Sequence, residues 1–195
     1  MSTCLTVFSI INMYNILKFH RKDIVSYAEV KRPSSIVVVL AGLGTILFFI
    51  EFLFYIALVF AGKLEIFNSY IPTLNFPGMI YVKSLGLAFT VFGYFLFIWS
   101  VVARGQYATS WGMSKNHVLV TWGPYRYVRH PSYTAYFLMF LGFSLTWLNL
   151  VAFLPLLAIP GYVKITVVEE ELLIRRFGEE YRRYQRRTGK FFPKI

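Results

Sequence analysis

Long uncharged stretches alternate with short basic segments along this chain, and the alternation predicts membrane-spanning helices. Residues 34–61 carry one charged side chain, Glu51, and residues 84–103 and 131–163 carry none. A helix needs roughly 20 apolar residues to cross a bilayer, so 34–61 and 84–103 each predict one span. Residues 1–17 are also uncharged but form a shorter run. We expect a short first span there, with an interfacial helix as the alternative.

The uncharged stretch 131–163 is too long for one ordinary span and barely long enough for two. Asn149 lies near its middle, and two prolines and a glycine follow in its second half. We therefore expect a tight helical hairpin, 132–147 and 150–166, that turns at Leu148-Asn149. A single tilted and kinked helix is the alternative. The predicted fold is an all-α polytopic membrane protein with about five transmembrane helices.

The segment after the hairpin has the periodicity of an amphipathic helix. Leu173, Phe177, Tyr181 and Tyr184 follow one another at helical spacing and share one face. This predicts a cytoplasmic helix over 169–187, in which Gly178 introduces a bend. We expect one membrane domain over 1–195, made of N-terminal spans (1–103) and a second half (104–195). The second half would comprise a polar loop (104–131), the hairpin (132–166) and the amphipathic helix (169–187).

Composition supports a membrane protein and narrows its partners. Of the 195 residues, 57% are hydrophobic and 15% charged, whereas soluble domains carry about 25% charge. The net charge of +11 fits basic segments that lie beside anionic lipid headgroups. We therefore expect membrane lipids, and no nucleic acid, as partners, and we expect a monomer. One cysteine and three histidines make a structural zinc site improbable, and we expect no metal.

The distribution of basic residues predicts the orientation of the spans. Eighteen of the 20 lysines and arginines fall in three groups, which five spans place on one side of the membrane. The positive-inside rule makes that side cytoplasmic. The N-terminus is then expected outside, and the polar loop and the C-terminus inside.

The polar loop contains an unusual concentration of reactive side chains. His117 and His130 flank a Gly-Pro turn together with arginines and tyrosines, and apolar runs lie on either side. A site built there lies at the membrane surface and can bring a water-soluble reagent to a lipid-soluble one. Further along, Glu169 falls on the apolar face of the predicted helix, where a carboxylate requires a cationic partner. Glu170 could instead simply complement the helix N-terminus.

Five short motifs in this half of the chain carry a family resemblance. HVLV, GPYRYVRHPSYTAY, EEELL, FGEEYRRY and a terminal Phe-Pro occur in order over about residues 104–193. This pattern resembles the isoprenylcysteine carboxyl methyltransferase family, which shares a core with membrane phospholipid methyltransferases. The resemblance implies S-adenosylmethionine as methyl donor and S-adenosylhomocysteine as product. The methylated group would be the α-carboxylate of an isoprenylated cysteine or a similar lipophilic acceptor that enters from the bilayer.

The resemblance also assigns roles to residues of this chain. It implies catalytic roles for Arg129, His130 and Glu169 and substrate contacts for Lys164 and Glu170. The implied cofactor pocket comprises His117, Leu119, Val120, Tyr125, His130, Pro131, Ser132, Tyr133 and Glu169. The family often has an arginine four residues before the paired glutamates, near the substrate carboxylate. This chain has Ile165 at that position, and Arg129 or Lys164 would have to take the role.

Elementary chemistry is consistent with methyl transfer and leaves alternatives. A carboxylate acceptor is already ionised at neutral pH and needs no general base, whereas an amine acceptor must first lose a proton. Two alternatives are a phospholipid or small amine or thiol methyltransferase with the same core, and a non-enzymatic or reductase-like membrane protein. Glu51, an acid within a predicted span, is either functional or a protonated packing element.

Overall fold

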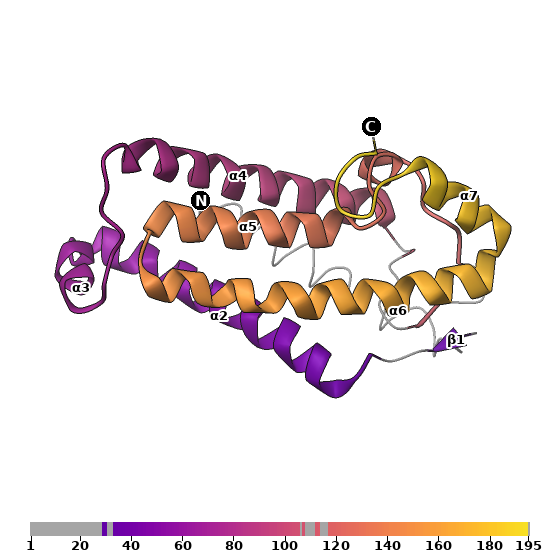
Figure 1. The fold of residues 1–195 in the computed structure, drawn as a ribbon, viewed down its shortest axis with the longest axis horizontal. Coiled ribbons are helices and arrows are strands. Elements are labelled where there is room, and N and C mark those ends of the chain that lie inside the picture. The colour runs from indigo at the N-terminus through magenta and orange to yellow at the C-terminus, as the bar shows by residue number, and fades with distance from the viewer. Residues whose placement is uncertain (1–28, 31–32, 106, 108–111, 114–116, 195) are drawn as a thin grey trace. The chain divides into compact units, whose positions relative to one another are not determined.

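Helices joined by turns and short irregular segments make up most of the described part of the chain (Figure 1), in which the strands form one two-residue pair. The computed structural model describes residues 29–30, 33–105, 107, 112–113 and 117–194. The elements are β1 (Glu29–Val30), α2 (Ser35–Phe60), α3 (Leu64–Tyr70), α4 (Met79–Arg104), β2 (Gly112–Met113), the 3-10 helix η1 (Gly123–Arg126), α5 (Pro131–Trp147), the 3-10 helix η2 (Leu150–Ala158), α6 (Ile159–Phe177) and α7 (Glu179–Arg187). The predicted all-α class is confirmed for these residues. The expected first span, 1–17, lies outside them.

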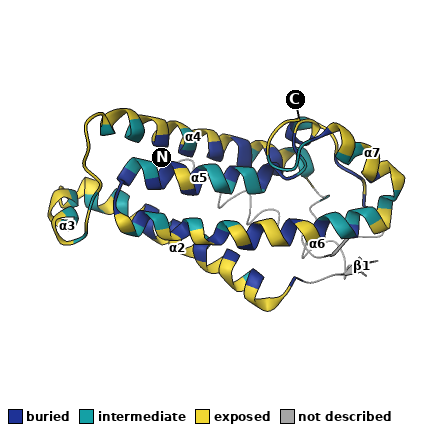
Figure 2. Cartoon of the chain, viewed as in Figure 1, coloured by how far each residue is buried: buried dark blue, intermediate teal, exposed yellow. Residues whose placement is uncertain are grey.

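Three of the described helices are long and apolar enough to cross a membrane: α2, α4 and the continuous η2–α6 segment Leu150–Phe177. Figure 2 shows exposed positions along much of α2, and most of the exposed residues there are large and apolar, such as Ile36 and Phe60. Such a surface is stable where lipid covers it. Helix α5 has 17 residues, somewhat short for a span on its own. The count of five spans therefore stays a prediction.

The contacts between residues divide the chain into two compact units, where the sequence led us to expect a single domain. The first, which we call the apolar unit, comprises Ser34–Gly93 and Ala135–Ile165. The second, which we call the polar unit, comprises Met1–Pro33, Tyr94–Thr134 and Thr166–Ile195. Helices α4, α5 and α6 each contribute residues to both units.

Small residues allow the helices of the apolar unit to approach closely. A Cβ atom on Gly142 of α5 would lie 2.6 Å from the carbonyl oxygen of Gly86 in α4. Gly44 of α2 touches Ala158 at the end of η2, whereas Gly42 has nothing within 4 Å. The close approach within α2 therefore occurs at Gly44. Contacts of this kind bring helices together where lipid removes most of the hydrophobic driving force.

Aromatic rings fill much of the interior of the apolar unit. Phe48 of α2 lies 5.1 Å from Phe140 and 5.7 Å from Phe143 of α5, measured between ring centroids. Tyr136 of α5 stacks on Tyr162 of α6 at 5.3 Å. These spacings are those of favourable edge-to-face and offset-stacked pairs. The rings therefore join α5 to both α2 and α6.

The turn between α5 and η2 falls at Leu148-Asn149, where the sequence predicted it. Leu148 has a positive φ of 56°, and the Asn149 side chain accepts a hydrogen bond from the Val151 backbone nitrogen. Asn68 Oδ1, in α3, accepts two further hydrogen bonds, one from Trp147 Nε1 and one from Asn149 Nδ2. The chain thus forms two helical segments here, and the alternative of one kinked helix is wrong.

The second arm of the hairpin differs from the expectation. Helix α6 continues from Ile159 to Phe177 without interruption, although we expected the hairpin to end at 166 and a new helix to begin at 169. No glycine or proline interrupts residues 162–177, so helix propagation continues. The break comes at Gly178, which adopts a positive φ of 53°, and α7 follows it.

Candidate functional site

The C-terminal tail folds back along the segment that leads into α5. Val128 and Gly189 form a parallel bridge, and the His130 backbone nitrogen donates to the Lys190 carbonyl at 3.1 Å. The Thr134 hydroxyl then donates to the Phe191 carbonyl at 3.0 Å. Because Pro131 begins α5 and keeps the preceding residue extended, His130 offers its backbone N–H to the tail. The tail therefore fixes the position of His130.

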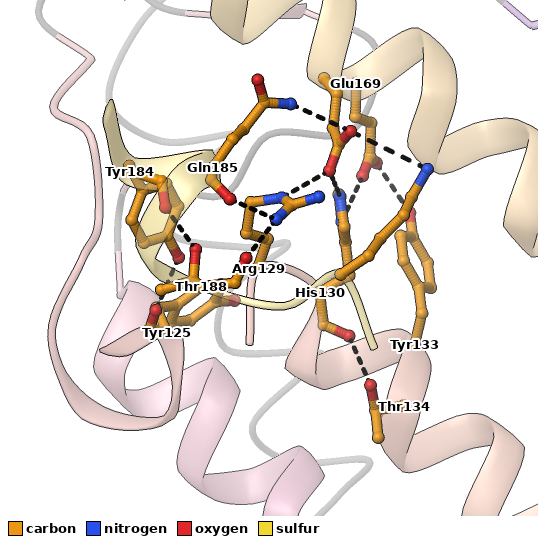
Figure 3. A network of polar contacts seen from close by, with 11 residues as sticks. Tyr125, Arg129, His130, Tyr133, Thr134, Glu169, Tyr184, Gln185 and Thr188 are labelled. Carbon is orange, nitrogen blue, oxygen red and sulfur yellow. Dashed lines mark hydrogen bonds and ion pairs between the residues drawn. The ribbon is translucent and has the colours of Figure 1, made fainter. Parts of the chain in front are cut away.

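Glu170 of α6 accepts hydrogen bonds from two other segments of the polar unit, whose side chains Arg129, His130 and Gln185 are labelled in Figure 3. Arg129 Nε donates to its Oε1 at 2.8 Å, and His130 Nε2 lies 3.1 Å from the same oxygen. Gln185 Nε2 donates to Oε2 at 3.3 Å. Arg129 Nη1 also donates to the backbone carbonyl of Thr188. The guanidinium of Arg129 is thus already engaged by groups of the protein, and Glu170 serves as the centre of a buried network.

The preceding residue, Glu169, is the more deeply buried carboxylate, with 6% of its surface exposed. The Tyr133 hydroxyl donates to its Oε1 at 2.7 Å. Its other oxygen, Oε2, lies 3.6 Å from His130 Nδ1, which is longer than a hydrogen bond. The Glu169 carboxylate therefore retains an oxygen with the capacity to accept a hydrogen bond from a ligand.

His130 lies between the two carboxylates, as Figure 3 shows. Burial lowers the pKa of His130, and this outweighs the opposite effect of Glu170. The imidazole is therefore neutral at pH 7 and carries one N–H. The shorter contact, from Nε2 to Glu170, takes that proton. This leaves the Nδ1 lone pair on the side of Glu169.

The C-terminal end of α4 is tied to the same network. Ser100 Oγ lies 2.8 Å from Ser132 Oγ in the first turn of α5, and Trp122 Nε1 donates to the Ala103 carbonyl at 2.8 Å. The Tyr184 hydroxyl donates to the Tyr125 carbonyl at 2.6 Å. Burial raises the pKa of Tyr125, against the effects of Arg104 and Ser132. The tyrosine is therefore an uncharged part of the wall.

His117, Leu119 and Val120 are buried in the polar unit. The ring of His117 lies 6.1 Å from that of Tyr107 and 6.0 Å from that of Phe177 at the end of α6. Burial lowers the pKa of His117 to about 4, and the charge of Arg176 acts in the same direction. The imidazole is therefore neutral at pH 7 and packs among aromatic rings.

The structure brings together most of the residues that the sequence indicated. One network of hydrogen bonds and close polar contacts joins Arg129, His130, Tyr133, Glu169 and Glu170, and Tyr125 and Ser132 adjoin it. Pro131 is buried at the start of α5. Lys164 is exposed and belongs to the apolar unit. Its role as a substrate contact stays a prediction that this network does not support.

Several residues in or beside the network were not predicted from the sequence. Backbone carbonyls or a neutral amide join Gln185, Thr188 and the tail to the network. Such contacts leave no recognisable residue pattern in the sequence. Arg104 was also missed, although it ends a long uncharged run and its position was a usable signal. Among the residues with described positions, no group of three or more His, Cys, Asp or Glu side chains is placed to hold a metal ion.

Comparisons with known proteins place the chain among similar membrane proteins. Residues 81–180, just over half of the chain, match the family model of phospholipid methyltransferases. A protein-S-isoprenylcysteine O-methyltransferase from Tribolium castaneum is 30% identical over 140 residues, which cover 65% of this chain and 48% of the relative. A nickel-cobalt-cadmium resistance protein from Alcaligenes xylosoxydans xylosoxydans is 39% identical over 83 residues, or 42% of this chain and 38% of the relative.

The fold is also similar to a solved structure, that of a eukaryotic intramembrane Ras methyltransferase, an isoprenylcysteine carboxyl methyltransferase. The TM-score is 0.51 at 25% identity, and the match covers 85% of this chain and 55% of the other. The chain thus spans about half the length of these relatives. It is an integral membrane protein, and it belongs to the phospholipid methyltransferase family.

Proposed function

We propose that this chain is an S-adenosylmethionine-dependent methyltransferase that methylates a carboxylate on a lipophilic, isoprenylcysteine-like acceptor. The observation that carries the proposal is the buried cluster of Glu169, Glu170 and His130. It is formed by the motifs that the chain shares with its family. We propose a carboxylate as the methyl acceptor because a similar protein is a protein-S-isoprenylcysteine O-methyltransferase.

The residues of the polar unit fit such a methyl donor, which carries a sulfonium, an amine and a carboxylate. Glu169 offers Oε2, which has no hydrogen bond of normal length among the described residues, and His130 Nδ1 faces the same side. An ammonium group satisfies both acceptors at once. Buried acceptors of this kind are costly unless they are paired. The donor would therefore supply the missing cation, together with the activated methyl group.

The protein's own contribution to the reaction would be positioning and exclusion of water. The bound donor would supply a methyl group bonded to a sulfonium sulfur; on transfer the S–C bonding pair would stay on sulfur, which would become a neutral thioether. A carboxylate oxygen of the acceptor forms the new O–C bond and becomes an ester. No proton moves, so neither glutamate has to act as a base. This balance fits a site whose histidine is neutral and already donates to Glu170.

We further propose that the polar unit faces the cytoplasm and that the acceptor's hydrocarbon tail enters from the bilayer. The basic residues of the polar loop and of α7 support this orientation by the positive-inside rule. The exposed apolar side chains of α2 and α4 support contact with lipid. The donor is water-soluble and the acceptor is not, so a site at the membrane surface serves both.

A second candidate function is methylation of a phospholipid amine, which the family match over residues 81–180 favours. The two acceptors differ in their need for a base. An amine with a pKa of roughly 10, by analogy with lysine, must lose a proton before it attacks, whereas a carboxylate with a pKa of about 3.5 is already ionised. Turnover that rises steeply between about pH 7 and pH 9 would favour the amine. A flat profile would favour the carboxylate.

The proposal is tested by calorimetric titration of the detergent-purified protein with S-adenosylhomocysteine, followed by labelled methyl transfer to N-acetyl-S-farnesylcysteine. The wild type is expected to bind and to transfer. Glu169→Gln should bind at least about tenfold more weakly, because a charged hydrogen-bond acceptor is lost. Glu179→Gln is the matched control, because Glu179 is 61% exposed and forms its ion pair with the surface residue Arg186. Absence of binding in folded wild-type protein would overturn the proposal.

A further inference from the structure

Arg104 is the last residue of α4, at the end of the long uncharged run. It lies one turn after Ser100 and therefore on the same face of the helix. That face meets α5, because Ser100 contacts Ser132 at 2.8 Å. The next residue of α5, Tyr133, donates to Glu169 at 2.7 Å. Helix geometry thus places Arg104 beside the cluster that we assign to the methyl donor.

The Nε atom of Arg104 is buried and has no hydrogen-bond partner within the described part of the chain. The guanidinium of Arg104 lies near Tyr125, with which its side chain also shares a hydrogen bond, and its charge acts on Glu169; the unsatisfied donor is therefore Nε alone. No salt bridge to Arg104 is present among the described residues, whereas Arg129, Lys190 and Arg186 all have carboxylate partners. A buried donor of a charged group is expensive to leave unsatisfied.

Arg129 cannot readily take the role that the sequence offered to it. Its Nε donates to Glu170, and its Nη1 reaches the carbonyls of Thr188 and Gln185. Turning it toward a ligand would break the network that holds the tail against His130. Lys164 is exposed and belongs to the other unit. Of the three cations, Arg104 alone combines a place beside Glu169 with an unsatisfied buried donor.

We propose that Arg104 binds a carboxylate of one of the two reactants at the methyl-transfer site. The inference rests on the proposed function and adds to it the residue that recognises the anionic group. A guanidinium matches a carboxylate with two parallel hydrogen bonds, and the Nε atom supplies one of them. The carboxylate belongs either to the amino-acid part of the methyl donor or to the acceptor. The chemistry of recognition is the same in both cases.

Arg104→Gln is the first test, with Arg126→Gln as its matched control. Arg126 is an exposed residue next to Tyr125, so the control removes the same charge from the same region without affecting a buried donor. Arg104→Lys keeps the charge but loses the forked geometry, and it serves as the second variant if the glutamine variant does not fold. Unfolding midpoints in detergent establish that each variant is folded before any binding is measured.

Two titrations distinguish the sources of the carboxylate. If the donor supplies it, Arg104→Gln weakens S-adenosylhomocysteine binding by about tenfold to hundredfold. An analogue of this product that lacks its α-carboxylate then binds the variant and the wild type equally. If the acceptor supplies it, S-adenosylhomocysteine affinity is unchanged, but N-acetyl-S-farnesylcysteine loses about tenfold or more, and its methyl ester loses nothing.

The outcomes separate this inference from the proposed function. A wild type that fails to bind S-adenosylhomocysteine removes the proposed function itself. A wild type that binds, together with a folded Arg104→Gln variant that has unchanged affinity for both probes, removes only the role of Arg104. Equal losses in Arg104→Gln and Arg126→Gln would also overturn it, because a general effect of surface charge would then explain the result.

Discussion

The two units of this protein are stabilised by different physical interactions. In the apolar unit, backbones meet at Gly86 and Gly142, and rings such as Phe48 fill the space between helices. In the polar unit, Glu170 joins Arg129 and His130 through charged and neutral hydrogen bonds. Close packing is short-ranged and tolerates no added volume. The buried network depends instead on each partner being present.

The comparison separates the residues that set helix positions from the residues that are available to a ligand. The packing of the apolar unit relies on close backbone contacts and aromatic rings, which hold helix positions within a lipid environment. The polar unit places two adjacent glutamates in different environments: Glu170 is satisfied by protein donors, whereas Glu169 keeps an accepting oxygen. One carboxylate thus stabilises the site, and its neighbour is available for a ligand.

The largest effect is expected from Glu170→Gln, which removes the charge at the centre of the polar network. Arg129 and His130 would remain buried without their carboxylate, at a cost of about 3 kcal/mol or more. The thermal unfolding midpoint in detergent should fall well below that of the wild type, and S-adenosylhomocysteine binding should weaken with it. Glu179→Gln, at an exposed pair, should leave the midpoint unchanged. Equal midpoints for the two variants would contradict the role of Glu170.

A smaller loss is expected from Gly142→Ala in the apolar unit. The added methyl group would lie 2.6 Å from Gly86 O and from Thr90 N, so α4 and α5 must move apart. Such overpacking costs about 1–3 kcal/mol, read as a lower unfolding midpoint. Gly42→Ala is the control, because nothing lies within 4 Å of that position. A stable Gly142→Ala protein would show that this close approach is dispensable.

The smallest effect near neutral pH is expected from the titration of His117. Its folded-state pKa of about 4 lies below the unfolded value of 6.5. The unfolded chain therefore binds more protons between these values, and stability rises with pH through this window. The contribution is complete above about pH 6.5, and on the order of 2 kcal/mol is lost by pH 5.

His117→Gln removes this contribution, so its unfolding midpoint should fall less between pH 7 and pH 5 than that of the wild type. The remaining slope comes in part from His130, whose pKa is also lowered by burial. Unfolding curves at the two pH values measure the difference. The same pH dependence in variant and wild type would place His117 in a solvated environment and contradict its burial.

Much of the candidate site followed from the sequence because its residues are concentrated in two segments. The segment around His130 and the pair Glu169-Glu170 each have a recognisable pattern, and helix periodicity correctly placed Glu169 on a buried face. The distinct roles of the two glutamates were only partly foreseen. The partners of Glu170 come from Arg129, His130 and Gln185, and the distance between these segments along the chain leaves no local signal.

Hydrophobic patterning by itself determined the helical class, the spans 34–61 and 84–103 and the turn at Leu148-Asn149, because burial in lipid and turn chemistry act locally. Only the tertiary structure decided that α6 runs unbroken to Phe177 and that the tail locks His130. It alone left Arg104 with an unsatisfied buried donor. These features depend on backbone contacts and on competition among partners that are distant along the chain. Local sequence patterns do not reveal such contacts.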